Sequence, residues 1–75
     1  MTTYNFTHKT ENGKWEIAID KAAQYGYFEN MNSGGGGGLW FEQNRMSDFD
    51  GVFELPKDVI KAIRQLGFTV PRDFE

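Results

Sequence analysis

Five consecutive glycines, Gly34–Gly38, are the residues whose type and spacing point most directly to chemistry. Glycine-rich loops bind phosphate through backbone N–H groups, but they also need a helix directly after the glycines and usually a lysine followed by serine or threonine. Here Leu39, Trp40 and Phe41 follow, and these residues favour a strand and supply no cation. The stretch therefore predicts the flexible tip of a hairpin and not a phosphate site.

A second candidate is Asp48-x-Asp50-Gly51, which resembles part of a calcium-binding loop. An EF-hand loop in this frame needs an acidic residue where Met46 stands and a glutamate where Lys57 stands. Both ligands are missing. An aspartate-rich turn that ends in glycine needs no metal, so we predict a structural turn and no metal site.

Nucleophiles and bases are scarce in this chain. His8 is the only histidine, there is no cysteine, and neither Ser33 nor Ser47 stands in a motif with an adjacent base. Zinc sites need several converging ligands, and nucleophilic catalysis needs a nucleophile, a base and a group that orients the base. We therefore predict no catalytic, cofactor-binding or metal-binding residues, and no enzyme activity.

Composition narrows the class of protein further. The 75 residues suit a single domain with a thin core, and the twelve aromatic residues supply much of the surface that such a core buries. A formal net charge of −3 argues against direct binding to nucleic acid, because such proteins concentrate lysine and arginine. No apolar run reaches the roughly 18 residues of a membrane span, and a cysteine-free chain suits a reducing cytoplasm.

The elements that must position these residues begin with a hairpin. Strands at 3–10 and 14–20 flank Asn12-Gly13, which favours a two-residue type I′ turn. That turn predicts the pairs Glu11 with Lys14, Lys9 with Glu16, His8 with Ile17, and Phe6 with Ile19. The alternation of residues then gives the hairpin one apolar and one polar face.

The middle of the chain predicts further strands at 25–31 and 39–43, joined by a mobile glycine loop at 32–38, and a short fifth strand at 51–55. Apolar and polar residues do not alternate strictly in these strands, so the pattern does not decide which of the two faces of each strand packs against the core. A helix is predicted over 56–67.

Helix boundaries are marked by Pro56 in the first turn and by Gly67 as a left-handed terminator, after which Phe68 folds back on the last turn. An apolar stripe of Val59, Ile60, Ile63 and Leu66 lies between them. Together the elements predict an α+β domain over residues 1–75, in which a four- to five-stranded antiparallel β-meander packs against one C-terminal α-helix in two layers. Thr69-Val70 is compatible with an added edge strand.

At YGYFE, GGGGGLWFE and DGVFELPKDVIKAIRQLGF the chain resembles small uncharacterised proteins carried by bacteriophages and mobile elements. The similarity covers roughly Trp15 to Phe68. It implies the setting of a stoichiometric inhibitor of host defence, such as an anti-CRISPR protein, in the cytoplasm of a bacterial host. The shared motifs mark structure and assign no functional residue.

We therefore expect a small non-enzymatic protein-binding module that inhibits a host defence or nucleic-acid-handling complex. Residues 22–56 contain five acids and only one base, Arg45, so the expected protein partner has a basic surface. The predicted partner-binding residues are Tyr27, Glu29, Trp40, Glu42, Asp48 and Asp50.

Two other functions are compatible with the sequence. One is a binder or sponge for a small nucleotide-like ligand, in which two copies close their glycine loops over the ligand. The other is a self-associating structural module in which exposed aromatic side chains form a homodimer.

Overall fold

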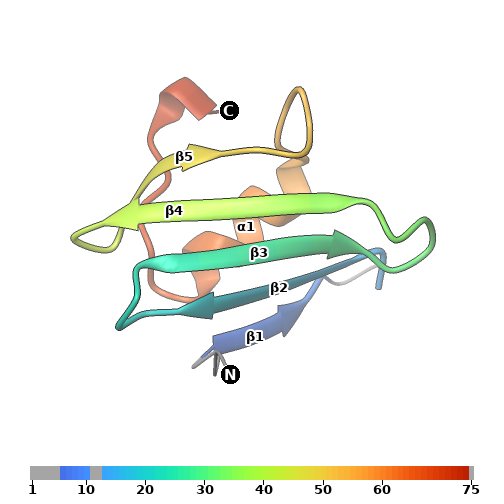
Figure 1. The fold of residues 1–75 in the computed structure, drawn as a ribbon, viewed down its shortest axis with the longest axis horizontal. Coiled ribbons are helices and arrows are strands. Elements are labelled where there is room, and N and C mark those ends of the chain that lie inside the picture. The colour runs from blue at the N-terminus through green and yellow to red at the C-terminus, as the bar shows by residue number, and fades with distance from the viewer. Residues whose placement is uncertain (1–5, 11–12, 75) are drawn as a thin grey trace.

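The computed structural model describes residues 6–10 and 13–74, and of Phe6 only the backbone. An antiparallel sheet of five strands in the order β1-β2-β3-β4-β5 precedes one α-helix (Figure 1). The elements are β1 Phe6–Lys9, β2 Trp15–Asp20, β3 Tyr25–Asn30, β4 Gly36–Glu42, β5 Arg45–Phe49, the helix α1 Lys57–Gln65 and a final 3-10 turn, η1 Arg72–Phe74. The predicted α+β class and β-meander are confirmed.

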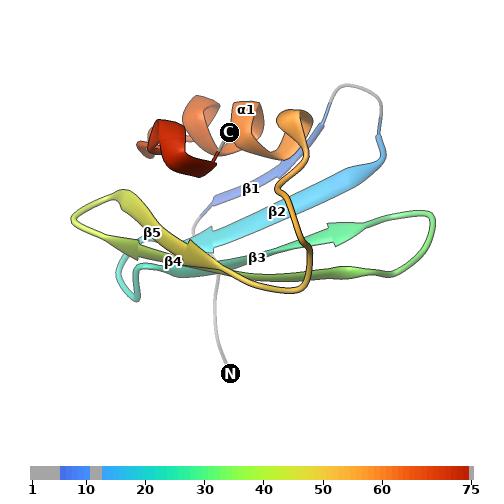
Figure 2. The ribbon, with the colours of Figure 1, turned by 90° about the horizontal axis from the view of Figure 1, so that it is seen from above.

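The molecule has two layers, with α1 lying across one face of the sheet (Figure 2). The core between the layers combines side chains from strands and helix that are 1% exposed or less: Ile17, Ile19, Phe28, Leu39, Met46, Val59 and Ile63. At one end of this core Phe41 packs against Phe68, with ring centroids 4.7 Å apart. No described residue covers the opposite face of the sheet (Figure 2).

The register of the first hairpin agrees with the prediction. Phe6 pairs with Ile19, His8 with Ile17, and Lys9 with Glu16. Glu11 and Asn12 lie outside the described residues, so the type I′ turn stays a prediction.

The predicted fifth strand at 51–55 is wrong. The fifth strand is β5, Arg45–Phe49, and residues 51–54 form a bend on the way to α1. The reason is the tight turn at Gln43-Asn44, where φ is 53° and 64°. Positive φ at both central residues is the geometry of a type I′ turn, and it returns the chain at once into a strand. Glutamine is uncommon at such a position, so the sequence pattern did not reveal the turn.

The predicted loop at 32–38 is too long. The turn after β3 occupies 31–35, and Gly36, Gly37 and Gly38 belong to β4, opposite Glu29, Phe28 and Tyr27. Close approach of neighbouring chain explains why these positions are glycine: a Cβ on Gly36 would overlap the Phe28 carbonyl oxygen, and one on Gly37 the Asp50 carbonyl oxygen. These glycines are therefore strand residues that admit close packing, and not a mobile tip.

The helix terminates at Gly67 as its sequence predicts, although its last regular residue is Gln65, two residues before the predicted end. Gly67 has a φ of 98°, its N–H donates to the Arg64 carbonyl at 3.0 Å, and the Phe68 N–H donates to the Ile63 carbonyl at 3.3 Å. These two bonds make a Schellman motif. Beyond it, Thr69 forms an isolated parallel bridge with Arg45 in place of a full edge strand.

Candidate functional site

The uncovered face of the sheet is the largest surface whose composition needs an explanation, and we call it the open face. Because side chains alternate along a strand, the residues next to the buried Ile17, Ile19, Phe28 and Leu39 point away from α1. The pairing of strands β2 to β5 brings these residues together. The open face comprises Glu16, Ala18, Asp20, Tyr25, Tyr27, Glu29, Gly38, Trp40, Glu42, Arg45 and Asp48.

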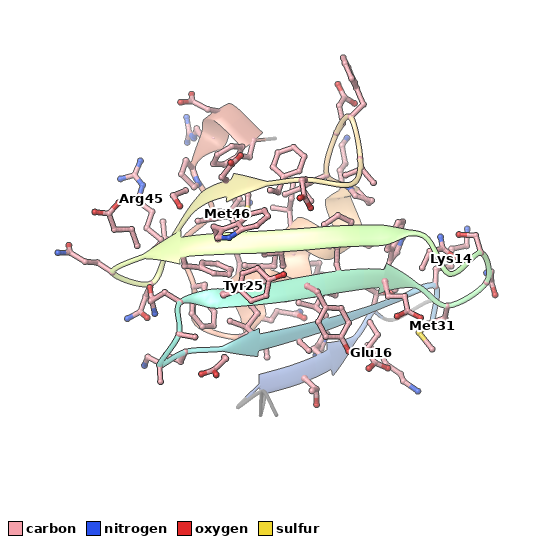
Figure 3. All side chains as sticks on the ribbon, in the orientation of Figure 1. Lys14, Glu16, Tyr25, Met31, Arg45 and Met46 are labelled. Atoms are coloured by element: carbon pink, nitrogen blue, oxygen red, sulfur yellow. The ribbon has the colours of Figure 1, made fainter. Side chains whose placement is uncertain are left out.

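Three aromatic side chains form the centre of the open face. Trp40 lies over Gly38, where an added Cβ would be 2.8 Å from the indole Cη2 atom. Tyr25, the cross-strand partner of Trp40, meets it edge-on with ring centroids 5.4 Å apart, and Figure 3 shows Tyr25 on β3. Tyr27 lies opposite Gly38, next to this pair. The aromatic centre is thus supported by its own neighbours, yet Trp40 keeps 37% of its surface exposed.

The glycine at position 38 has a specific role in this arrangement. Any larger side chain there would lift the Trp40 ring off the strand or displace it sideways. Ala18, which pairs with Tyr27 on the other side of β3, is also small and is 1% exposed. Small residues under large rings let the rings lie close to the sheet, which holds them in one orientation.

Carboxylates surround the aromatic centre. Glu29, Glu42 and Asp48 are exposed and Glu16 is half-buried. Glu16 and Glu29 stand directly opposite each other on β2 and β3, an arrangement of like charges that destabilises a sheet. Lys9 lies on the other side of Glu16, where it offsets part of this repulsion.

Asp20 and Asp50 accept backbone hydrogen bonds that tie the fold together, whereas the Asp48 carboxylate accepts from the adjacent Phe49 N–H, at 2.8 Å. Asp20 accepts hydrogen bonds from the N–H groups of Ala22 and Ala23, at 3.0 and 3.2 Å, and so closes the β2–β3 turn. Asp50 accepts one from the Gly38 N–H at 2.7 Å, and its own N–H donates to the Gly38 carbonyl at 3.1 Å.

The structure brings five of the six predicted partner-binding residues to one face. Tyr27, Glu29, Trp40 and Asp48 share the open face with Glu42, which lies beyond the β-bulge between Trp40 and Phe41. Asp50 is the exception. Its carboxylate points back to the β4 backbone, so we assign it a structural role.

Sequence reasoning missed Tyr25 and Glu16 as members of this face. The register of the first hairpin contains the signal for Glu16, because it places Glu16 on the polar face. For Tyr25 the signal is the neighbouring Gly26, where an added Cβ would be 2.9 Å from Ile19 Cγ1. Gly26 and Phe28 therefore face the core, and Tyr25 and Tyr27, which alternate with them, face outward.

No group of three histidine, aspartate or glutamate side chains within 6–10 and 13–74 converges as metal ligands do. His8 is half-buried opposite Ile17 at the edge strand β1. Within the same residues, no helix has the length and apolar character needed to cross a bilayer.

Comparison with protein-family models, with curated proteins and with solved structures finds no match to this chain.

Proposed function

We propose that this chain is a non-enzymatic protein-binding module that docks its open face on a basic surface of a partner protein. The observation that carries the proposal is the aromatic centre of Tyr25, Tyr27 and Trp40 within a border of carboxylates. Aromatic anchors at the centre of an interface contribute most of its affinity, while charges at its border steer association and select the partner.

The opposed pair of Glu16 and Glu29 supports a basic partner. A neutral or basic residue at either position would relieve the repulsion, so this sheet keeps an electrostatic cost that a cationic partner would remove. Among the strand partners of these carboxylates, Lys9 and Arg45 supply positive charge. The same charge distribution argues against docking on the phosphate backbone of nucleic acid.

The class of partner follows from the resemblance to small phage-borne proteins. Host defence and nucleic-acid-handling complexes bind their substrates through basic surfaces. An acidic face with aromatic anchors is complementary to such a surface, so it would act by occupying the place of the nucleic acid in the bacterial cytoplasm. This mode of inhibition needs no turnover.

The test is capture of partners from a bacterial lysate by the immobilised chain, with Glu29→Lys as the decisive variant. This change reverses a charge of the open face and removes the Glu16–Glu29 repulsion, so the variant is expected to fold at least as stably as the parent. The matched control is Asp73→Lys, which makes the same change of charge on the exposed 3-10 turn η1.

We expect Glu29→Lys to lose the captured protein and Asp73→Lys to keep it, and we expect capture to weaken as salt screens the charges. A captured protein that binds the folded Glu29→Lys variant as tightly as the parent would remove the open face as the binding site.

The nucleotide-like ligand held between glycine loops has less support, because three of the five glycines belong to β4. A ligand that binds only the folded chain raises its melting temperature, so a thermal-shift screen with nucleotides distinguishes the two functions.

A further inference from the structure

Phe53 is the most exposed large apolar side chain among the described residues, at 96% of its full surface. It belongs to the loop between β5 and α1, which stands out from the rest of the fold (Figure 1). A phenylalanine side chain gains free energy when it leaves water, so this position leaves that gain unused within the chain.

The loop that carries Phe53 is attached to the fold at both of its ends. Before Phe53, Asp50 makes two hydrogen bonds to Gly38, and Gly51, with a φ of 86°, packs closely against the backbone of β4. After Phe53, Leu55 is 5% exposed and belongs to the core. The exposure of Phe53 therefore results from the fixed path of the chain.

A groove lies beside α1. Its described lining consists of Lys57, Ile60, Lys61, Arg64 and Gln65, and its volume is about 510 Å³. Ile60, only 4% exposed, lies at its base, and the apolar surface that the groove presents comes mainly from the stems of the long side chains around it. The Arg64 guanidinium donates to the Val70 carbonyl at 2.9 Å, which fixes one wall.

We propose that Phe53 of one copy inserts into the α1 groove of a second copy. The ring would lie over Ile60 against the apolar stems of the surrounding long side chains, while Glu54, the exposed neighbour of Phe53, would lie near the cations of the groove. The contact joins two different surfaces of the same chain. If both copies insert their phenylalanine, it closes a two-fold dimer, and otherwise it repeats as a chain of copies.

A second copy is favoured as the occupant because both halves of the contact lie in this molecule and carry opposite charge: Glu54 stands beside Phe53, and cationic side chains line the groove. Small domains also bury little of their surface alone, so association adds to a thin core. This contact is independent of the proposed function: it leaves the open face uncovered, and two open faces in one assembly would strengthen binding to a repeated partner surface.

The test is sedimentation velocity of the full chain from about 10 µM to about 1 mM, a range that covers weak, small interfaces. We expect the parent to associate, and Phe53→Ser to weaken association at least about tenfold, as loss of an interface anchor does. The matched control is Met31→Ser, which removes another exposed apolar side chain, 45% exposed and close to Lys14 on the loop after β3 (Figure 3), and should leave association unchanged.

Lys57→Glu tests the groove. It places an anion in the first turn of α1, which favours the helix, so weaker association would report a change in the contact and not unfolding. A monomeric parent over the whole range, or unchanged association in Phe53→Ser or in Lys57→Glu, would overturn the inference. Loss of association in Glu29→Lys would also overturn the inference, because that result would place the self-contact on the open face. Loss of partner capture without loss of association would bear only on the proposed function.

Discussion

At the scale of single residues, the five glycines have different surroundings although their sequence is uniform. Gly35 lies in the turn, where an added Cβ would be in ordinary contact, 3.5 Å from Ser33 Oγ. Gly37 lies in β4 on the side of the core, where an added Cβ would overlap the backbone carbonyl of Asp50. Backbone atoms of a neighbouring segment move less readily than a flexible side chain, so the two positions should respond very differently to alanine.

Gly37→Ala is therefore expected to lower the free energy of unfolding by about 2 kcal/mol or more, the cost of overpacking. Gly35→Ala, the matched control, should change it by less than about 0.5 kcal/mol. Chemical denaturation of both variants measures the difference. Equal effects of the two substitutions would show that the glycines form one uniform loop.

The Glu16–Glu29 pair allows a second prediction at this scale. Glu29→Gln removes one of two opposed charges and should raise the free energy of unfolding by about 0.2–1 kcal/mol at low salt. The gain should shrink as ionic strength rises, because salt screens the repulsion that the substitution removes. Denaturation at two salt concentrations measures both effects; a destabilised variant would contradict a cost of repulsion at this pair.

At the scale of elements, two turns at the same end of the sheet are joined by side-chain hydrogen bonds. Gln24, after β2, accepts from the Asn44 N–H at 2.6 Å and donates to the Asn44 Oδ1 atom at 2.9 Å. It also donates to the Lys21 carbonyl at 2.8 Å. The Asn44 carbonyl in turn accepts from the Thr69 N–H at 2.9 Å, so Gln24 supports the turn on which the tail after α1 is held.

Gln24→Ala should destabilise the fold by about 1–2 kcal/mol, because it leaves the donor and acceptor groups of Asn44 without this partner. Gln43→Ala is the matched control, since Gln43 has almost the same φ, 53° against 54°, and an exposed side chain. We expect that control to cost less than about 0.5 kcal/mol. If thermal denaturation gives the same loss for both, the effect belongs to backbone strain and not to the bonds between the turns.

At the scale of the whole molecule, sheet and helix share a single core and neither layer has one of its own. Ile17 and Ile19 of the sheet and Val59 and Ile63 of the helix are all fully buried together. Removing the helix would expose the apolar side of every central strand. The two layers should therefore unfold as one cooperative unit.

Calorimetry should show one transition with an unfolding enthalpy of about 50 kcal/mol near 60 °C, from the usual value per residue for 75 residues. The van't Hoff enthalpy should equal the calorimetric value. Ile17→Ala and Ile63→Ala, one from each layer, should both lower the melting temperature of that single transition. Two separable transitions would show that the layers are independent.

Much of the architecture was predictable from local patterns. The hairpin register followed from a turn dipeptide and alternating residues, and the end of α1 followed from Gly67 and Phe68. Five of the six predicted site residues lie on one face; Tyr27 and Glu29, like Trp40 and Glu42, are two positions apart, and such side chains point to the same side of a strand. The place of the fifth strand was not predictable, because the type I′ turn at Gln43-Asn44 has glutamine at its first central position, where asparagine, aspartate or glycine is usual.

The sequence by itself determined the fold class, the helix with its terminator and the acidic, aromatic character of the central strands, because these depend on neighbours along the chain. Only the tertiary structure decided which aromatic side chains face α1, that Asp50 serves the fold and that Phe53 is exposed. It also decided that Gly36–Gly38 are strand residues. The physical reason is that neighbouring segments approach closely at Phe28 and Asp50, which sets the space at Gly36 and Gly37, and no local sequence pattern records that space.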